Sequence, residues 1–413
     1  MSLLVRAARI VDPASGLDAE GDLLIGDDGR LQALGLAAAL GAAEVVEARG
    51  LIACPGLVDL HVHFREPGQE HKETIASGAR AAAAGGFTTV VCETNTSPVI
   101  DNALLLQELR ARAAGESVQV LFKHCLTVGQ AGKQVADLQA ARRAGAAAAS
   151  DDGQPTLDGE VMHQGLAAAR AAGLVVTPHC EESLASREAD PWPVPYRREP
   201  ALVKRDLALA GETGAALHLS HLSTAEAVRA LAAARARGWA VSGEVTPHHL
   251  TLCAEQAGDH PDFKTNPPLR SRTDQEAMQQ ALAAGVVEVI ASDHAPHTPE
   301  EKAQGWEQAP FGLIGLETAL AVLLTGLVAA GRMRLEALLA ALTWHPARVL
   351  GLQAGRLAVG ERADLCLFDA GRRWRVDPAN FASKGRNCPW AGQWLTGRVV
   401  MTVAGGRVAY QGG

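Results

Sequence analysis

The sequence predicts an α/β fold: a (β/α)8, TIM-like barrel with a small β-sandwich domain formed by both termini. Two observations predict it. Residues 54–351 alternate apolar strand runs with helical patterns, which is typical of parallel strands joined by helices. Residues 1–53 and 352–413 contain short strands joined by turns instead, so we expect the two ends to pair into one domain.

The composition is that of a globular chain long enough for a barrel and an appendage. The 413 residues are 47% hydrophobic and carry a formal net charge of −8, which argues against nucleic acid or an anionic membrane as the main partner. Seven cysteines without a Cys-x-x-Cys pair are typical of a reducing compartment. Leu3-Leu4-Val5 reads as a strand rather than a signal peptide, and the most apolar helical stretch, 318–330, is too short to span a bilayer. We therefore expect a cytoplasmic protein.

The strands of the two ends are recognised by their flanking turns. Near the N-terminus, Ile10-Val11 leads into the turn Asp12-Pro13, and a strand ending at Ile25 is followed by the hairpin signal Asp27-Asp28-Gly29. Near the C-terminus, strand runs cover 364–368, 399–403 and 407–410, and Gly405-Gly406 separates the last two.

The middle of the chain contains eight apolar strand runs. They cover 57–63, 87–91, 118–122, 146–150, 174–179, 216–221, 240–245 and 287–292. Helical patterns lie between them, for example at 134–143, 201–211 and 225–237, and Ser223-x-x-Glu226 and Thr273-x-x-Glu276 match the capping-box pattern. Eight such units predict a closed parallel barrel. A doubly wound open sheet is the alternative, but its first unit would need a glycine-rich phosphate loop, which this sequence lacks.

Metal-binding residue types follow five of these strands. In a barrel, the carboxyl ends of the strands meet at one rim, where the chemistry takes place. The segments at that rim are His61-Val62-His63, Asp151-Asp152, His179, His221 and Asp293-His294. Four histidines and two aspartates suit two divalent ions with one bridging carboxylate.

Alternation along strands selects among these candidates. His61, His63 and Arg65 have the same parity and are expected to point the same way. In the sixth strand His221 stands at the tip, while His218 has the opposite parity and is expected to pack behind it. His248-His249 follows the seventh strand and is expected to support the site rather than bind metal. Asp151 could also simply cap its turn.

Together these motifs resemble the dihydroorotases of the amidohydrolase superfamily, of the type that uses an aspartate where relatives use a carboxylated lysine. The resemblance covers almost the whole chain. It rests on residues 55–65, Gly85-Gly86-Phe87-Thr88-Thr89, Asn95-Thr96, Ser150-Asp151-Asp152-Gly153, His179-Cys180-Glu181, His221-Leu222-Ser223-Thr224, Asn266-Pro267-Pro268, residues 292–297 and Ser383-Lys384-Gly385-Arg386-Asn387.

The resemblance implies a role for each candidate residue. His61, His63 and Asp293 are expected to bind one zinc ion, His179 and His221 a second, and Asp151 to bridge the two. Asp293 is also expected to move the proton. Arg65, Asn95 and His297 match positions that hold the substrate carboxylate, and Asn266 matches a further pocket residue. The implied reaction interconverts dihydroorotate and N-carbamoyl-L-aspartate in pyrimidine biosynthesis.

Two segments depart from the family pattern or require a separate check. Glu93-Thr94 stands where Met-Pro is usual, before the predicted substrate residue Asn95. Lys123 lies near a strand end, but relatives place the carboxylated lysine on the fourth strand, where Asp151 stands here.

The metal residues alone leave other functions open. Hydantoinases, dihydropyrimidinases and allantoinases share the expected fold and metal set, but Arg65, Asn95 and His297 favour a substrate with a carboxylate. A non-catalytic subunit that supports aspartate transcarbamoylase is a further alternative, which the complete ligand set disfavours. A homodimer, or a catalytic subunit docked on aspartate transcarbamoylase, stays open as well.

Overall fold

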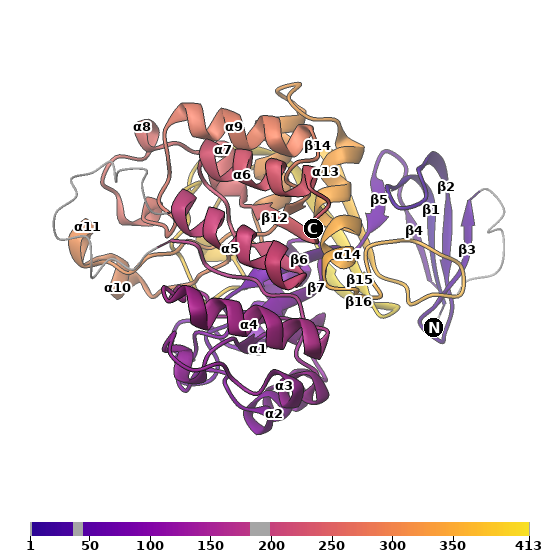
Figure 1. Ribbon diagram of the computed structural model, residues 1–413. Coiled ribbons are helices and arrows are strands. Elements are labelled where there is room, and N and C mark those ends of the chain that lie inside the picture. The colour runs from indigo at the N-terminus through magenta and orange to yellow at the C-terminus, as the bar shows by residue number, and fades with distance from the viewer. Residues whose placement is uncertain (1, 36–43, 182–198, 413) are drawn as a thin grey trace.

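The computed structural model describes residues 2–35, 44–181 and 199–412. Its centre is a series of parallel strands, and a separate sheet with both parallel and antiparallel pairs lies at one end (Figure 1). The central strands are β6 (Leu57–Val62), β7 (Phe87–Cys92), β8 (Gln119–Phe122), β9 (His124–Cys125), β10 (Ala149–Ser150), β11 (Leu217–Leu219), β12 (Val241–Val245) and β13 (Val289–Ile290).

These central strands pair in sequence order, and the last returns to the first. Strands β6, β7 and β8 pair in parallel, β9 pairs with β10, and β11, β12 and β13 form another parallel set. Single parallel bridges at Val176 connect β10 to β11. Val62 bridges to His294, and the His63 amide donates to the His294 carbonyl at 2.9 Å, so the segment after β13 lies beside β6.

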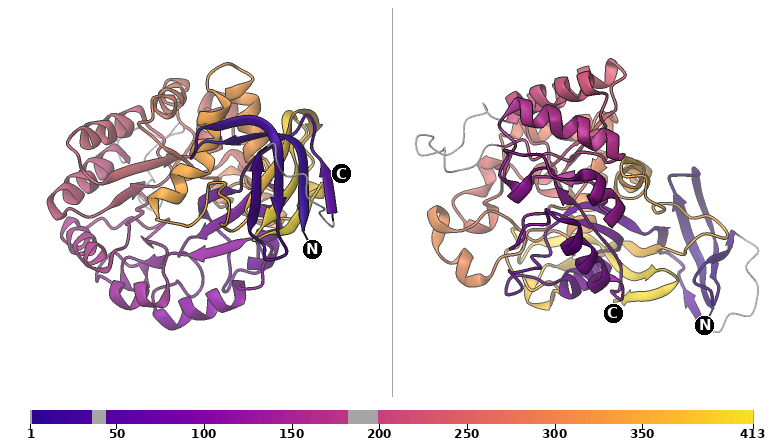
Figure 2. Two further views of the ribbon diagram at one scale, coloured as in Figure 1. Left: turned by 90° about the vertical axis from the view of Figure 1, so that its right-hand side faces the viewer. Right: turned by 60° about the horizontal axis from the view of Figure 1, so that its bottom comes forward.

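Helices lie outside the central strands (Figure 2). The longer ones are α1 (Ile75–Ala84), α2 (Ala103–Ala113), α3 (Leu138–Ala144), α4 (Gly159–Ala172), α5 (Glu199–Thr213), α6 (Ala225–Ala236), α9 (Arg272–Ala283) and α13 (Leu335–Leu342). Shorter ones are α7 (Pro247–Thr251), α8 (Ala254–Ala257), α10 (Pro299–Lys302), α11 (Gly305–Gln308), α12 (Ala319–Leu323) and α14 (Trp344–Val349). Among the described residues, no helix has the length and apolar character needed to cross a membrane.

Helices α6 and α9 are capped by other residues than the capping-box patterns predicted. Helix α6 is capped by Thr224, whose hydroxyl accepts from the Ala227 amide, while Ser223 instead hydrogen-bonds to buried Glu199. Helix α9 is capped by Ser271 rather than Thr273. Both predicted boxes were therefore wrong by one or two residues, because several hydroxyl side chains precede each helix and tertiary contacts decide which one caps it.

Strands from both ends of the chain form one eight-stranded sheet. They are β1 (Leu3–Asp12), β2 (Leu17–Ile25), β3 (Leu31–Gly35), β4 (Glu44–Glu47), β5 (Ile52–Pro55), β14 (Leu365–Arg375), β15 (Trp394–Ala404) and β16 (Arg407–Gln411). Strand β5 joins the two ends, since it pairs with β1 on one side and with β14 on the other. Hydrogen bonds join these strands into one sheet, whereas the predicted β-sandwich would have two separate sheets. The two ends of the chain share one hydrophobic core cluster, which includes Val5, Leu23, Leu367 and Val403.

The end sheet packs directly against the first units of the central strands. The Gly56 amide donates to the Asp364 carbonyl at 2.9 Å, and the Thr402 hydroxyl donates to the Ala83 carbonyl of α1 at 2.7 Å. Gly86 has a positive φ of 90°, and a Cβ there would lie 2.6 Å from the Cys366 sulfur. Glycine is therefore required where the strand β7 approaches this sheet.

Candidate active site

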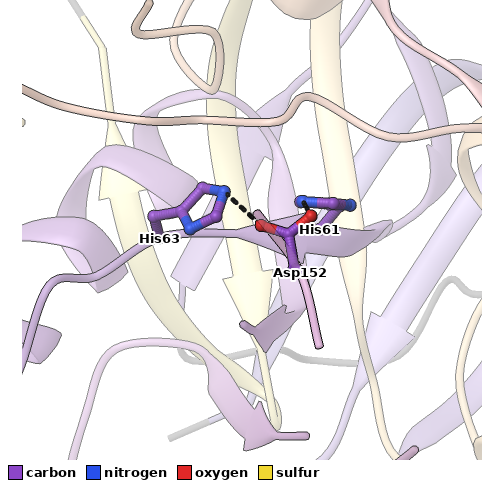
Figure 3. Close-up of side chains that lie close together, drawn as sticks. All are labelled: His61, His63 and Asp152. Carbon is purple, nitrogen blue, oxygen red and sulfur yellow. Dashed lines mark ion pairs between the residues drawn. The ribbon is translucent and has the colours of Figure 1, made fainter. Parts of the chain in front are cut away.

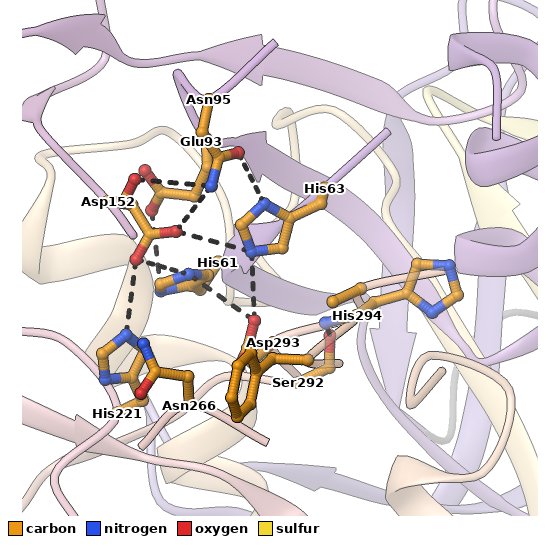
Figure 4. Close-up of polar contacts among 12 residues, drawn as sticks. His61, His63, Glu93, Asn95, Asp152, His221, Asn266, Ser292, Asp293 and His294 are labelled. Carbon is orange, nitrogen blue, oxygen red and sulfur yellow. Dashed lines mark hydrogen bonds and ion pairs between the residues drawn. The ribbon is translucent and has the colours of Figure 1, made fainter. Parts of the chain in front are cut away.

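The candidate histidines and aspartates meet at the carboxyl ends of the central strands. His61 belongs to β6 and His63 follows it, while His221 follows β11 and Asp293 follows β13. All four are buried. Figure 4 shows the three histidines around the carboxylate of Asp152, with Asp293 directed at His61 and His63. Four segments that are distant in sequence thus supply these residues.

Asp152 is shared by two groups of possible metal ligands. Its carboxylate forms one group with His61 and His63 (Figure 3) and a second with His179 and His221, and the ligand atoms of each group lie within 4.8 Å of one another. Asp152 Oδ1 lies 3.4 Å from His61 Nε2 and 3.3 Å from His221 Nε2, and Oδ2 lies 3.6 Å from His63 Nε2. Burial opposes ionisation of Asp152, but the neighbouring imidazoles hold its pKa well below the usual value.

The prediction that Asp151 lies between the histidines was wrong. Its Oδ1 accepts from the amides of Leu126 and Thr127 at 3.0 and 3.2 Å, and its Oδ2 accepts from the hydroxyls of Thr127 and Thr156. Burial outweighs these hydrogen bonds and raises the pKa of Asp151. Asp151 therefore holds its own loop in place, and the side chain of the next residue, Asp152, lies among the histidines instead.

The donor set fits a divalent metal. Imidazole nitrogen and carboxylate oxygen are common zinc ligands, and a bridging carboxylate suits two ions. His61 Nε2 and His221 Nδ1 are buried without a hydrogen-bond partner among the described residues. His179 Nδ1 also lies only 2.9 Å from His221 Nε2. Buried nitrogen atoms rarely lack a hydrogen-bond partner, so these imidazole nitrogens are suited to bind a cation.

Asp293 faces Nε2 of His61 and of His63, as Asp152 also does. Its Oδ1 is 3.1 Å from His63 Nε2 and 3.7 Å from His61 Nε2. Burial opposes ionisation, but the hydrogen bond from His63 and the neighbouring imidazoles hold the pKa of Asp293 below its usual range.

Three residues of the site have a left-handed backbone. Asp293, His221 and Arg65 have positive φ values of 48°, 35° and 60°. Such a conformation costs about 1–3 kcal/mol for a residue other than glycine, and it occurs where function requires a defined side-chain direction.

A cavity of about 260 Å³ opens beside the cluster. Arg65 and His297 line it together with His63, Asp152, His179, His221 and Asp293. Arg65 Nη2 lies 3.2 Å from His297 Nε2, and His297 Nε2 donates to the Phe311 carbonyl at 2.8 Å.

The two side chains differ in charge. Burial lowers the pKa of Arg65 to about 10, so the guanidinium stays charged at neutral pH. Burial and the nearby cations lower the pKa of His297, so its imidazole is neutral.

Asn95 and Asn266 line the same cavity and contact the candidate metal ligands directly. Asn95 Oδ1 accepts from His63 Nδ1 at 2.9 Å, and Asn95 Nδ2 donates to Asp152 Oδ2 at 3.1 Å. Asn266 Nδ2 donates to His179 Nε2 at 3.0 Å. Both amides therefore orient the cluster as well as facing the cavity.

Several residues around the site were not predicted to act there. Glu244 accepts from His61 and from His218, so His218 packs behind the cluster, and Glu93 and Lys123 lie nearby as a buried ion pair. Asn387 hydrogen-bonds to the backbone of the loop that carries His297. Position at or near the end of a strand could have indicated Glu93 and Glu244, as it did Lys123, which was considered only as a carboxylated bridge. Nothing local in the sequence indicates the contact of Asn387.

The comparisons agree with this geometry. Residues 52–409 match the model of the amidohydrolase family. A dihydroorotase from Pelotomaculum thermopropionicum is 43% identical over 423 residues, which covers 100% of this chain and 99% of that protein. A dihydroorotase from Citrifermentans bemidjiense is 41% identical and fully covered.

Solved structures are also similar to this chain. An L-hydantoinase (dihydropyrimidinase) from Arthrobacter aurescens is 26% identical, with a TM-score of 0.90 over 100% of this chain and 96% of that one. A dihydropyrimidinase from Brevibacillus agri, 24% identical with a TM-score of 0.87 over 99% of this chain and 95% of that one, shares the fold. On the family match and the full-length identity to its relatives, the chain belongs to the amidohydrolase family and, within that family, to the dihydroorotases.

Proposed function

We propose that this enzyme interconverts dihydroorotate and N-carbamoyl-L-aspartate, the cyclisation step of pyrimidine biosynthesis. The observation that supports it best is one small cavity that joins two metal-ligand groups to a buried arginine. A cluster of His and Asp suits metal-dependent hydrolysis of an amide, and the guanidinium of Arg65 suits a carboxylate on the substrate.

The ring of strand pairings supports a closed (β/α)8 barrel over residues 54–351. The sheet of residues 1–53 and 352–413 then forms the second domain. The candidate metal ligands lie on or after the ends of strands, which supports this proposal because active sites in such a barrel lie at the carboxyl ends of its strands.

The metal is proposed to be zinc, with two ions per subunit. His61, His63 and Asp293 would hold one ion, His179 and His221 the other, and Asp152 would bridge them. Bound there, the ions would supply an activated water at neutral pH and polarise the amide carbonyl.

Asp293 is the proposed proton carrier. In the hydrolytic direction, water adds to the ring carbonyl carbon, the ring C–N bond breaks, and the departing nitrogen takes up a proton. Asp293 is buried beside His63 and lines the cavity, so its carboxylate can accept the proton of the water and deliver it to that nitrogen. Cyclisation uses the same steps in reverse.

Arg65, His297, Asn95 and Asn266 are proposed to orient the substrate. Arg65 offers paired N–H donors to the carboxylate, and His297 lies beside the guanidinium at the same end of the cavity. Asn95 and Asn266 link the substrate pocket to the metal ligands that they contact.

The test is ring opening of dihydroorotate by zinc-loaded protein, with dihydrouracil and a hydantoin measured in parallel. We expect turnover of dihydroorotate and little turnover of the two neutral rings, because only dihydroorotate carries the carboxylate for Arg65. Turnover of the neutral rings alone would contradict the substrate and favour a hydantoinase or dihydropyrimidinase. No turnover by zinc-loaded protein would contradict the proposed activity.

A further inference from the structure

A buried ion pair lies beside the metal-ligand cluster without entering it. Glu93 directly follows β7 and Lys123 directly follows β8, and the Lys123 ammonium donates to Glu93 Oε1. The side chains of Glu93 and Lys123 are 0% and 1% exposed. Two opposite charges have therefore been placed together in the interior of the barrel region, where water cannot screen them.

Glu93 faces His61 on the side away from the proposed metal. Glu93 Oε1 lies 3.5 Å from His61 Nδ1, and Glu244 Oε1 lies 3.0 Å from the same nitrogen. The other ring nitrogen, His61 Nε2, faces Asp152 and Asp293. The imidazole thus has two carboxylates at Nδ1 and the candidate ligand cluster at Nε2. Figure 4 shows His61 together with Glu93, Asp152 and Asp293.

The remaining contacts of Glu93 do not explain its burial. Its Oε2 is buried without a hydrogen-bond partner among the described residues. The carboxylate therefore does not tie other segments together through that oxygen. Buried ion pairs are also weak stabilisers, since well-packed apolar residues of similar volume often serve as well. What the carboxylate does contact, besides Lys123, is His61.

We propose that Glu93, held by Lys123, is a positioning residue for His61. Glu244 accepts the hydrogen bond of Nδ1, and the negative charge of Glu93 adds to its effect. Together they favour the proton on Nδ1, which leaves Nε2 free as the metal-binding atom and makes the imidazole a better ligand. The Lys123 ammonium offsets the free-energy cost of burying the Glu93 carboxylate and holds that carboxylate beside His61. This proposal rests on the metal site of the proposed function, and it assigns the pair to metal affinity rather than to folding.

Two variants test the assignment. The double variant Glu93→Leu with Lys123→Met replaces the ion pair by apolar side chains of similar size. Glu93→Gln keeps the size and an acceptor for Lys123 but removes the charge at His61. The readouts are the zinc dissociation constant, measured by competition with a chromophoric chelator, and thermal unfolding of the metal-free protein.

We expect the double variant to fold and to bind zinc about tenfold more weakly, since carboxylates behind a ligating histidine contribute about 10- to 100-fold to metal affinity. Glu93→Gln should lose affinity in the same direction. The control is Arg235→Met with Glu288→Leu, which removes a partly exposed ion pair of 2.7 Å near the amino ends of the strands. The control should leave the zinc affinity unchanged.

Each remaining outcome is decisive. Wild-type zinc affinity in folded Glu93→Gln and in the folded double variant would overturn the proposal. If the double variant fails to fold, Glu93→Gln decides, and failure of both to fold would assign the pair to stability and also overturn the proposal. Failure of the wild-type protein to bind zinc would instead contradict the proposed metal site.

Discussion

Two adjacent aspartates at the end of β10 have different surroundings and different tasks. Asp151 accepts four hydrogen bonds from the loops around it, whereas Asp152 is surrounded by imidazoles. The first is therefore a structural residue, and the second is the candidate ligand shared by both metal groups.

Substitution by asparagine should separate these two tasks. Asp152→Asn is expected to fold but to lose zinc affinity by more than about 100-fold, because a direct ligand should matter more than its outer partners. Asp151→Asn is expected to keep zinc and to lose about 1–3 kcal/mol of unfolding free energy, since it loses hydrogen bonds in a buried site. Zinc titration and thermal unfolding of both variants check this. Loss of zinc by the Asp151 variant alone would contradict it.

Asp293 allows a prediction about turnover. Asp293→Asn should fold and, at saturating zinc, show a kcat lower by about 10²- to 10⁴-fold, because an amide cannot carry the proton. Steady-state assays with dihydroorotate, alongside a zinc stoichiometry measurement, test it. A near-normal kcat would exclude Asp293 as the proton carrier.

The sequence predicted the histidines of the site better than its aspartate, for a physical reason. His61 and His63 lie on and directly after a six-residue strand, so alternation predicts which way they point. Strand β10 has only two residues, and the chain leaves it in a turn. Alternation therefore gave no guide there, and the hydrogen bonds that hold Asp151 come from residues 24 and 25 positions away.

At the scale of elements, a segment from the C-terminal part of the chain supports the wall of the cavity. Asn387 Oδ1 accepts from the His297 amide at 3.2 Å, and its Nδ2 donates to the carbonyls of Ala295 and Gly312. Glu73 accepts from Ser383 and from the Lys384 amide, and His294 donates to it at 3.4 Å. The segment 383–387 thus fastens the loop between Asp293 and His297.

Asn387→Asp should loosen that wall. A carboxylate cannot donate to the two carbonyls, so we expect a loss of about 1–3 kcal/mol in stability from the unpaired groups. The KM for dihydroorotate should rise more than kcat falls, because His297 is proposed to contact the substrate while Asp293 keeps its own partners. Steady-state kinetics and thermal unfolding give the measurement. Unchanged KM would show that the loop holds its shape without Asn387.

Local patterns could not predict such connections. The sequence indicated that Ser383-Lys384-Gly385-Arg386-Asn387 matters, but not that it contacts residues about 90 positions earlier. The capping boxes failed for the same reason. The hydroxyl of Ser223 is engaged by Glu199, so Thr224 caps α6.

At the scale of the molecule, a buried carboxylate links the C-terminal segment to the central part. Glu317, just before α12, accepts from the amides of Ala382 and Ser383 at 3.2 and 3.1 Å. Burial, with a smaller contribution from the charge of Glu73, raises its pKa to about 7, while the two amide hydrogen bonds and the charge of Arg386 oppose the shift. Arg80 and Arg398 line the cavity that Glu317 also faces.

Glu317 should make stability depend on pH. Its pKa is higher in the folded than in the unfolded protein, so the folded state holds more protons between pH 4.5 and about 7, and stability falls across that window. Glu317→Gln removes this dependence. Relative to wild type, the variant should gain up to about 3 kcal/mol from pH 4.5 to 7 and no more above it. Denaturant unfolding at several pH values tests this, and parallel curves would contradict it.

The large-scale arrangement was the most predictable part. The two ends contain turn-flanked strands and the middle alternates strand and helix patterns, so the grouping of the segments follows from periodicity alone. The pairing of β5 with β14 was not predictable in detail, because many apolar strands could have served as its neighbour.

That pairing has a consequence for how the chain folds as it is made. Cys54 of β5 lies opposite Cys366 of β14 in the sheet, yet the two residues are separated by about 310 positions. A ribosome takes roughly 15–60 s to synthesise that length of chain. Until then the edge of β5 has no partner, and unpaired strand edges favour aggregation. The nascent chain therefore has to protect that edge, or keep it disordered, until its last strands emerge.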